Sequence, residues 1–302
     1  MALSPEEFVK RLEAISGSDG ILYGRVHLLF EKEQKYQQKA LQYKGYLALS
    51  DAFKCFFIET TELINTVCRP QIKAPLSEYY PIFVPRLTHG FQSLCGAERI
   101  AIYGYPLHAY TLLRNIFDNA VLTSAALQKV TNFYSIEGVT PGKNLDNEEV
   151  KRLRKKTEFY VRQRMTGNQS GLTQQVRAEL AKWDALFDFE VHGARLSLTG
   201  ALGWMRGIDS LPILPQFDEI QFAMFMNRYC EVGWMVHRLT PALQPPSVPF
   251  PAAWMEKWRI LDESFESIVN SLTEQLGKKI GTAIVELVKT KFPFNAQSAF
   301  PL

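Results

Sequence analysis

Apolar residues recur along this chain mainly at steps of three and four, the spacing that places them on one face of an α-helix. Glu, Gln, Lys and Leu, which lose little rotamer freedom in helices, fill many positions between them. The pattern predicts helices over residues 4–15, 25–43, 47–67, 79–94, 97–128, 147–164, 172–193, 195–205 and 217–239. Alternation typical of strands is confined to residues 99–105. The sequence therefore predicts an all-α fold, an irregular helical bundle.

Prolines mark interruptions in this pattern, because proline lacks the backbone N–H that a helix interior requires. Pro81 and Pro85 fall in the first turns of the helix expected over residues 79–94. Pro106 falls inside the most apolar segment, residues 97–128, where we expect it to kink a central and mostly buried helix.

The segment 241–251, PALQPPSVPFP, holds five prolines and is expected to be an extended connector. It separates a helical bundle domain, residues 1–240, from a carboxy-terminal segment, residues 252–302. There, apolar residues from Trp254 to Leu287 recur at helical spacing and predict one long amphipathic helix, which Gly277 and Gly281 weaken in the middle. The apolar stripe of this helix must be covered, either by the bundle or by a second copy of the chain.

The central apolar helix also carries a polar stripe. Its members lie within about 120 degrees of one another at roughly 100 degrees per residue, and they are His108, Thr111, Arg114, Asn115 and Asp118. One interpretation is a solvated face with an i,i+4 ion pair between Arg114 and Asp118. The other is a polar groove inside the bundle, which the apolar flanking residues favour. The sequence leaves both open.

A second candidate site lies in residues 187–198, FDFEVHGARLSL, where Asp188, His192 and Arg195 follow one another at spacings of four and three. A carboxylate one turn before an imidazole can fix its tautomer and raise its basicity, as a general base requires. Gly193 is expected to end the helix directly after His192, where a helix favours positive charge. A histidine that is simply hydrogen-bonded in a helix junction fits the same pattern.

A third candidate is the basic run KRLRKKTEFYVRQR, residues 151–164. It holds seven basic residues against one Glu, namely Lys151, Arg152, Arg154, Lys155, Lys156, Arg162 and Arg164. The aromatic residues Phe159 and Tyr160 are interleaved with them. Phosphate contacts from the cations and stacking on the aromatic rings would suit RNA or another single-stranded nucleic acid. A solvated helix face, partly neutralised by Asp146, Glu148 and Glu149, is the alternative.

Composition narrows the function classes only slightly. The chain has 302 residues, of which 46% are hydrophobic and 22% charged, and a formal net charge of +3, which is too mild to indicate a nucleic-acid partner without a local basic surface. The amino-terminal residues lack the pattern of a signal peptide, and no window approaches the roughly 20 apolar residues of a membrane span. We therefore expect a cytoplasmic protein that does not enter a membrane.

Motifs for nucleotides, metals and nucleophilic catalysis are missing from the sequence. There is no GxGxxG, GxxxxGK[ST], HExxH or GxSxG, and the cysteines form no CxxC pair. We expect no metal site and no cofactor. The four cysteines, Cys55, Cys68, Cys95 and Cys230, are expected to be free thiols packed in a reduced protein.

The segments AYTLLRNIFDNAVL, residues 109–122, and FDFEVHGARLSL together resemble two signature helices of the HEPN-like family of all-helical bacterial proteins. Arg114 and Asp118 match the Arg and the acidic residue of the first helix, and His192 with Gly193 matches the histidine turn of the second. These motifs are short, and the resemblance covers about residues 79–203. It implies an all-helical fold, frequent homodimers and, in the active relatives, metal-independent RNA cleavage in toxin or phage-defence systems.

The active relatives place an Arg four to six residues before the catalytic His, and this chain departs from that pattern. The residues before His192 include Ala185, Leu186 and Phe187, and none of them is an arginine. Either cleavage has been lost, or Arg114 reaches His192 from another helix.

Three functional hypotheses follow. The first is a HEPN-like binding or regulatory protein in bacterial defence or RNA-linked stress, in which Arg114, Asp118 and His192 form a polar pocket. The second is a metal-independent RNase with His192 as acid or base and Arg114 or Arg195 at the phosphate. The third is a structural dimerisation module built on the carboxy-terminal helix. The candidate partners are accordingly RNA, another protein or a second copy.

Overall fold

The computed structural model describes residues 7, 10, 21–69, 80–140, 142–166, 181, 217–245 and 248–291. Within these ranges every regular element is a helix, which confirms the predicted all-α class. The longer elements are α2 (Ile21–Ala40), α3 (Lys44–Leu63), α5 (Tyr80–Ile102), α6 (Pro106–Leu127), α8 (Asn147–Thr166), α11 (Glu219–Leu239) and α12 (Ala252–Lys291). A π-helical turn, Ile64–Cys68, extends α3, and the short helix α7 spans Phe133–Ile136.

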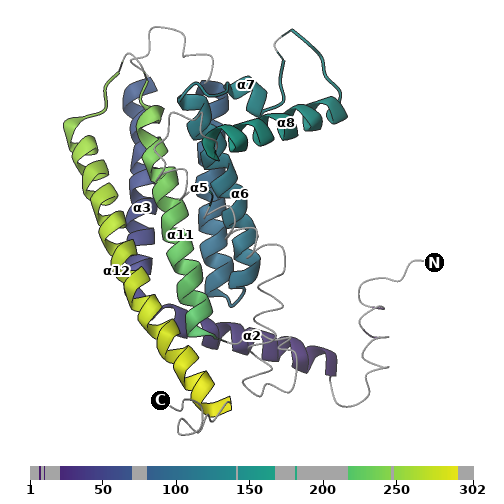
Figure 1. Cartoon of the computed structure of the whole chain (residues 1–302), viewed down its shortest axis with the longest axis vertical. Coiled ribbons are helices and arrows are strands. Elements are labelled where there is room, and N and C mark those ends of the chain that lie inside the picture. The colour runs from purple at the N-terminus through teal and green to yellow at the C-terminus, as the bar shows by residue number, and fades with distance from the viewer. Residues whose placement is uncertain are drawn as a thin grey trace, which may run out of the picture.

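The helices α3, α5, α6, α11 and α12 run side by side as a bundle (Figure 1). Helix α2 crosses one end of this bundle, and α8 lies across the other end. None of the described helices combines the length and the apolar character needed to cross a membrane.

Helices α5 and α6 form a hairpin, and here the predicted boundary was wrong. We expected a break before residue 97 and a kink at Pro106, but α5 continues to Ile102 and the chain turns at residues 103–105. Gly104 supplies the positive φ of 102° that this turn requires, and Pro106 opens α6 rather than bending it. A proline in the first turn of a helix costs little, because the N–H it lacks has no helical partner there.

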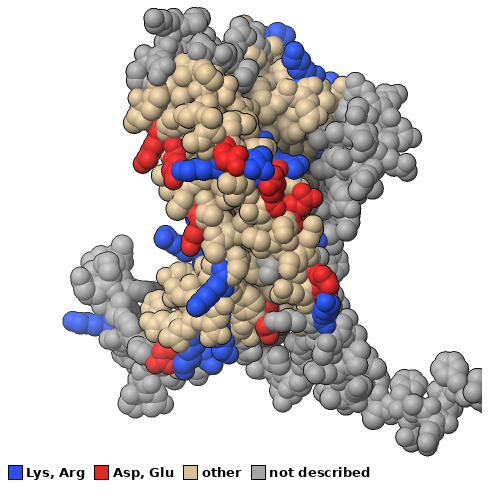
Figure 2. Space-filling model, turned by 90° about the vertical axis from the view of Figure 1, so that its left-hand side faces the viewer, with Lys and Arg blue, Asp and Glu red and all other residues tan. Residues whose placement is uncertain are grey.

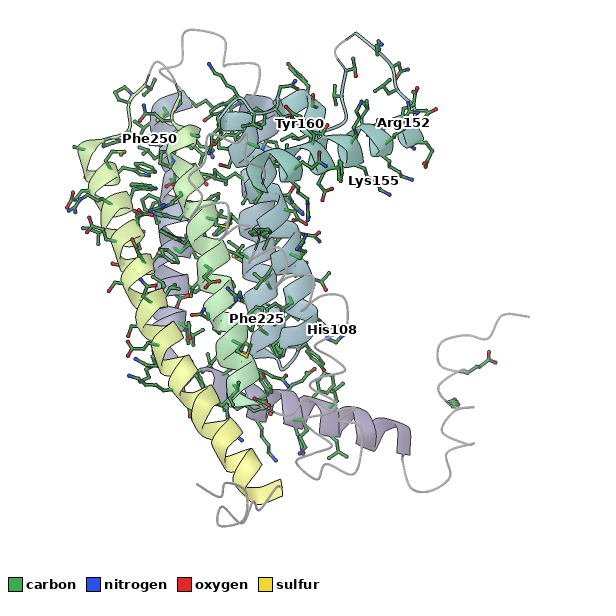
Figure 3. The ribbon with its side chains drawn as sticks, in the orientation of Figure 1. His108, Arg152, Lys155, Tyr160, Phe225 and Phe250 are labelled. Carbon is green, nitrogen blue, oxygen red and sulfur yellow. The ribbon has the colours of Figure 1, made fainter. Side chains whose placement is uncertain are left out.

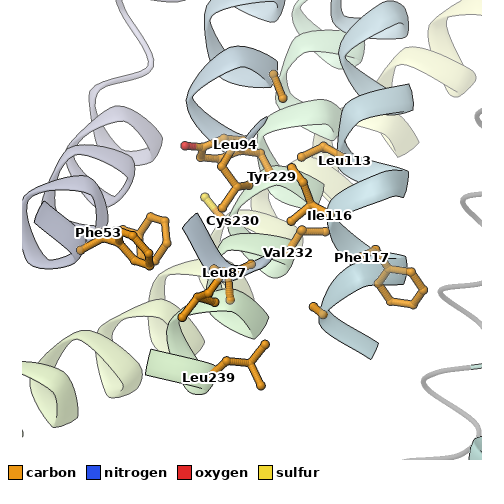
Figure 4. Close-up of a cluster of buried hydrophobic side chains, with 14 of the residues drawn as sticks. Phe53, Leu87, Leu94, Leu113, Ile116, Phe117, Tyr229, Cys230, Val232 and Leu239 are labelled. Atoms are coloured by element: carbon orange, nitrogen blue, oxygen red, sulfur yellow. The ribbon is translucent and has the colours of Figure 1, made fainter. Parts of the chain in front are cut away.

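Helix α11 lies at the centre of the bundle and packs against α3, α5, α6 and α12. Its buried side chains include Phe225 and Tyr229, which are 0% and 1% exposed. Figure 4 shows Tyr229, Cys230 and Val232 of α11 among Leu94 of α5 and Leu113 of α6, with Phe53 of α3 nearby. The core is therefore assembled from helices that are far apart in the sequence.

The amino-terminal half of α12 packs on α3 and α11. Trp254 and Phe265 are buried, and the indole N–H of Trp254 donates to the hydroxyl of Thr60 on α3 at 2.8 Å. The bundle, and not a second copy of the chain, therefore covers the apolar stripe of α12 as far as Val269. The division of the chain into residues 1–240, 241–251 and 252–302 stays a prediction.

The Pro-rich connector is less extended than expected at its start. Residues Thr240–Leu243 form one 3-10 turn with a proline in its first turn. The carbonyl of Leu243 accepts a hydrogen bond from the Tyr80 hydroxyl at 2.7 Å, and the side-chain oxygen of Gln244 accepts one from the Phe250 N–H at 3.1 Å. The first bond joins the connector to α5, and the second lies within the connector itself.

Candidate nucleic-acid interface

Helix α8 begins with a reciprocal capping arrangement. The Asp146 carboxylate accepts hydrogen bonds from the backbone N–H groups of Glu148 and Glu149 at 2.9 and 2.8 Å, and the Glu149 carboxylate accepts one from the Asp146 N–H at 3.1 Å. This is the capping box that an acid at the N-cap and a Glu three residues later predict. The helix N-terminus is thus already occupied by carboxylates, so a phosphate must be met by side chains further along α8.

The inner face of α8 is small and apolar. Val161 is fully buried against Ala125 of α6, with Val121, Leu122 and Val130 packed around this pair. At the other end, Gly138 has a φ of 66°, and a Cβ there would lie 2.6 Å from the carbonyl oxygen of Val150. Only glycine allows the chain after α7 to approach α8 this closely.

A shared carboxylate, that of Glu137, ties α8 to α5. On α8, the Arg154 guanidinium donates to the Glu137 backbone carbonyl at 2.9 Å and to its carboxylate at 2.8 Å. On α5, Arg86 forms an ion pair with the other carboxylate oxygen of Glu137 and donates to the Asn119 side chain at 2.5 Å. Glu137 therefore bridges two arginines that lie on different helices.

A second shared carboxylate, that of Asp118, ties α8 to α6. The Arg114 Nε donates to one of its oxygens at 3.0 Å, and the Arg162 guanidinium of α8 donates to the other at 2.9 Å. Arg162 also lies 3.2 Å from the Glu158 carboxylate. Burial raises the pKa of Asp118 above its usual value, and Arg114 and Arg162 oppose this rise. Arg114 and Asp118, both predicted site residues, thus take part in holding α8 in place.

The rest of the predicted polar stripe on α6 faces outward. His108, Thr111 and Asn115 are exposed, while the Arg114 and Asp118 side chains are 12% and 25% exposed. The expected i,i+4 ion pair is present. These exposures favour the interpretation of a solvated face that ends in an interhelical ion-pair cluster.

The seven predicted phosphate-binding residues of α8 fall into different groups. Arg154 and Arg162 bind carboxylates of the bundle, and Lys151 forms an exposed pair with Glu148 at 2.8 Å. Arg152, Lys155 and Lys156 are exposed, and within the described part of the chain they have neither an acidic partner nor a hydrogen bond from their side chains. The side chain of Arg164 lies outside the described residues.

An exposed aromatic residue follows these three cations on the same face of α8. Phe159 follows Lys155 by four residues and Lys156 by three, so the three side chains share one face of the helix. Phe159 is 62% exposed and the next residue, Tyr160, is 44% exposed. We call Arg152, Lys155, Lys156, Phe159 and Tyr160 the α8 surface; Figure 3 shows Arg152 and Lys155 on the part of α8 that projects beyond the bundle, and Tyr160 nearer to it.

The opposite side of the molecule provides a contrast. Figure 2 shows the face that carries α12, where basic and acidic side chains alternate. Lys257 pairs with Glu59 of α3 at 2.6 Å, and Arg259 pairs with Glu256 and Glu263 at 2.7 and 2.6 Å. These cations are neutralised locally, whereas Arg152, Lys155 and Lys156 leave positive charge available for a partner.

The remaining predicted site residues, Asp188, His192 and Arg195, lie outside the residues that the structure describes, as do the helices expected over residues 172–193, apart from residue 181, and 195–205. Among described residues, no group of three or more His, Cys, Asp or Glu side chains is arranged to hold a metal ion. All four cysteines are free, as expected, but Cys55 is exposed rather than packed.

Arg86 and Glu137 both position α8, but neither was predicted from the sequence. Their contacts join residues 51 positions apart, and such a pair has no periodic signal in a single sequence. Comparison of the chain with protein-family models, curated proteins and solved structures gave no match.

Proposed function

We propose that this chain is a HEPN-like helical binding protein, acting in bacterial defence or RNA-linked stress, that contacts single-stranded RNA through the α8 surface. The observation that carries the proposal is that Arg152, Lys155 and Lys156, which have no acidic partner among the described residues, lie on the same face of α8 as Phe159, which is 62% exposed. Cations along one helix face neutralise phosphates, and an exposed ring offers a face on which an unpaired base stacks. A duplex would conceal that base.

Binding is better supported than cleavage. The RNase hypothesis with Arg114 at the phosphate requires its guanidinium to stabilise negative charge on the substrate. In this chain Arg114 donates to Asp118 at 3.0 Å, and the same carboxylate also binds Arg162. Recruiting Arg114 to a phosphate would therefore weaken the attachment of α8. The RNA-binding proposal has no such conflict, because its three cations are not needed to hold the fold.

The number of available cations predicts the salt dependence of binding. Three phosphate contacts to a single strand give a slope of log K against log salt of about −2, so affinity should fall roughly 20-fold between about 50 and 200 mM salt. Seven contacts, as the sequence alone suggests, would give a slope of about −5 and a fall of roughly 900-fold. Fluorescence anisotropy with a labelled oligouridylate at several salt concentrations measures the slope.

Two triple variants test whether binding depends on the α8 surface or only on the net charge of the protein. Replacing Arg152, Lys155 and Lys156 together by alanine should bring the slope close to zero. Replacing Lys32, Lys35 and Lys44, three exposed lysines at the other end of the bundle, by alanine removes the same net charge and should leave the slope unchanged. Equal losses in both triple variants would show that binding is nonspecific, and no binding by the wild-type protein would refute the proposed function.

Phe159 should contribute to affinity through stacking. Base–aromatic stacking is worth about 1–3 kcal/mol per base, so Phe159→Ala should weaken oligouridylate binding about 5- to 150-fold. Phe159→Trp should restore or increase affinity, whereas Phe159→Leu, which is apolar without a π-face, should not. An oligonucleotide with abasic sugars should bind all these variants equally. If Leu supports binding as well as Phe, the ring does not stack on a base.

A further inference from the structure

Helices α11 and α12 exchange a reciprocal pair of hydrogen bonds. The imidazole Nε2 of His237, on α11, lies 3.1 Å from the backbone carbonyl oxygen of Trp258, on α12. In return, the indole N–H of Trp258 donates to the backbone carbonyl of His237 at 3.2 Å. Because the partner of Nε2 is a carbonyl, Nε2 must carry the proton, and a neutral ring then leaves Nδ1 without one.

The His237 ring is enclosed by aromatic side chains. It is 0% exposed and stacks on Trp258 at a centroid distance of 5.4 Å and on Phe265 at 5.9 Å. Phe53 and Phe56 of α3 meet it edge to face at 6.2 and 5.1 Å. The Nδ1 atom is buried and has no hydrogen-bond partner within the described chain. A proton added at Nδ1 would therefore create a buried charge with an unsatisfied N–H.

The charged groups near His237 are already engaged with one another. Asp262 of α12 accepts hydrogen bonds from the Trp234 indole at 2.6 Å and from Arg238 at 2.9 and 3.0 Å. Arg238 also lies 4.1 Å from the centre of the Trp234 ring. The side chains that α3 packs on the imidazole are phenylalanines and carry no charge. Asp262 thus favours a protonated His237 only at a distance, and Arg238 opposes it.

We propose that the reciprocal His237–Trp258 pair is an acid-sensitive latch, which holds the amino-terminal half of α12 on the bundle and releases it when the imidazole gains a proton. Release would uncover the apolar faces of Trp254 and Phe265 and the surface of α3 and α11 beneath them. This device does not depend on nucleic-acid binding by α8, which lies at a different place on the molecule (Figure 1).

The direction of the pH effect follows from the two states of the helix. Burial lowers the pKa of His237 in the closed state, although the bond to Trp258 and the charge of Asp262 oppose this shift. In the open state the ring is in water, where its pKa is about 6.5. The latch is therefore fully effective above about pH 6.5, and below it the opening equilibrium constant should rise about tenfold per pH unit until the closed-state pKa is reached.

Other groups in the seam do not account for such a change between pH 8 and 5.5. Burial raises the pKa of Asp262, but the hydrogen bonds from Arg238 and Trp234 outweigh that effect and leave it below the usual value for an aspartate. The Arg238 guanidinium, held by Asp262, stays charged throughout. Of His237, Arg238 and Asp262, only His237 has an ordinary pKa, about 6.5, that lies within this range.

Hydrogen exchange of the full-length protein tests the latch. Between pH 8 and 5.5, after correction for intrinsic exchange rates, peptides from residues 252–269 should open more often, by up to about tenfold, while peptides from α5 and α6 keep their protection. His237→Gln keeps an N–H donor but cannot be protonated, and should remove the pH dependence. His89→Gln, at an exposed position of α5, is the matched control and should retain it.

A second variant covers the case in which His237→Gln does not fold. Trp258→Phe keeps an aromatic ring on the imidazole and removes only the indole N–H, so α12 should open more at every pH with the same pH dependence as the wild type. The proposal is overturned if wild-type α12 opens equally at pH 8 and 5.5. It is also overturned if α5 and α6 open together with α12, or if His237→Gln retains the full pH dependence.

Discussion

Replacing Phe265 by alanine is expected to lower the free energy of unfolding by about 3–5 kcal/mol, the cost of truncating a fully buried phenylalanine. Phe265 is 2% exposed, meets Phe53 at a ring distance of 5.9 Å and stacks on His237 at the same distance. Gly233 of α11 lies beneath its ring. The cavity left by alanine would open between three helices whose backbones cannot all close around it. Urea denaturation followed by circular dichroism measures the loss.

Ile260 provides the matched control for this substitution. It lies on the same helix, five residues earlier, but is 50% exposed. Ile260→Ala should change stability by less than about 0.5 kcal/mol, as surface substitutions usually do. If both alanine variants lose the same stability, or if Phe265→Ala loses less than about 1 kcal/mol, the amino-terminal half of α12 does not pack on the bundle in solution.

The contrast between Phe265 and Ile260 shows what the spacing of apolar residues can and cannot predict. The three- and four-residue spacing of Trp254, Trp258, Leu261 and Phe265 predicted one stripe and therefore one buried face of α12. It did not say what would cover that face, because a neighbouring helix and a second copy of the chain require the same apolar pattern. The choice depends on α3, whose Phe53 and Phe56 precede Phe265 by more than 200 residues, and on α11, whose Gly233 precedes it by 32 residues. Such distances carry no signal in the spacing.

The prediction of a kink at Pro106 was wrong for a different reason. A proline in an apolar segment predicts a kink, a break or the start of a helix, and the three outcomes share the same local sequence. Gly104, two residues earlier, supplies the deciding signal, since its positive φ allows a tight reversal directly before the proline. A glycine and a proline together indicate a turn more strongly than either does alone.

For the candidate site, the sequence identified the residue types and the structure sorted them. Arg154 and Arg162 look the same in the sequence as Lys155 and Lys156, but their roles differ because Glu137 and Asp118 bind only the first two. These carboxylates come from other elements, so local charge counts could not separate a structural arginine from an available lysine. The fold, and not the local sequence, therefore decides which cations stay exposed without an acidic neighbour.

A buried ion pair in the core, between α3 and α5, likewise depends on residues that lie far apart in the sequence. The Lys54 ammonium lies 2.5 Å from the Glu98 carboxylate, and the two side chains are 22% and 7% exposed. Burial lowers the pKa of Lys54, but its bonds to Glu98 and Asp51 outweigh that effect and raise it. Lys54 is therefore charged in the folded protein at neutral pH, and the nearby Glu98 carboxylate offsets the free energy that its ammonium loses on leaving water.

Lys54→Ala is accordingly expected to lower the free energy of unfolding by about 3 kcal/mol, because it leaves the Glu98 carboxylate buried without its counter-ion. The exposed pair Lys257–Glu59 has almost the same separation, 2.6 Å, but side-chain exposures of 58% and 52%, so Lys257→Ala should cost less than about 1 kcal/mol. Replacing both partners, as Lys54→Met with Glu98→Leu, should recover most of the loss, since neither charge then remains to be desolvated. If the double variant is no more stable than Lys54→Ala, the loss arises from altered packing around residue 54 and the buried charge is not its cause.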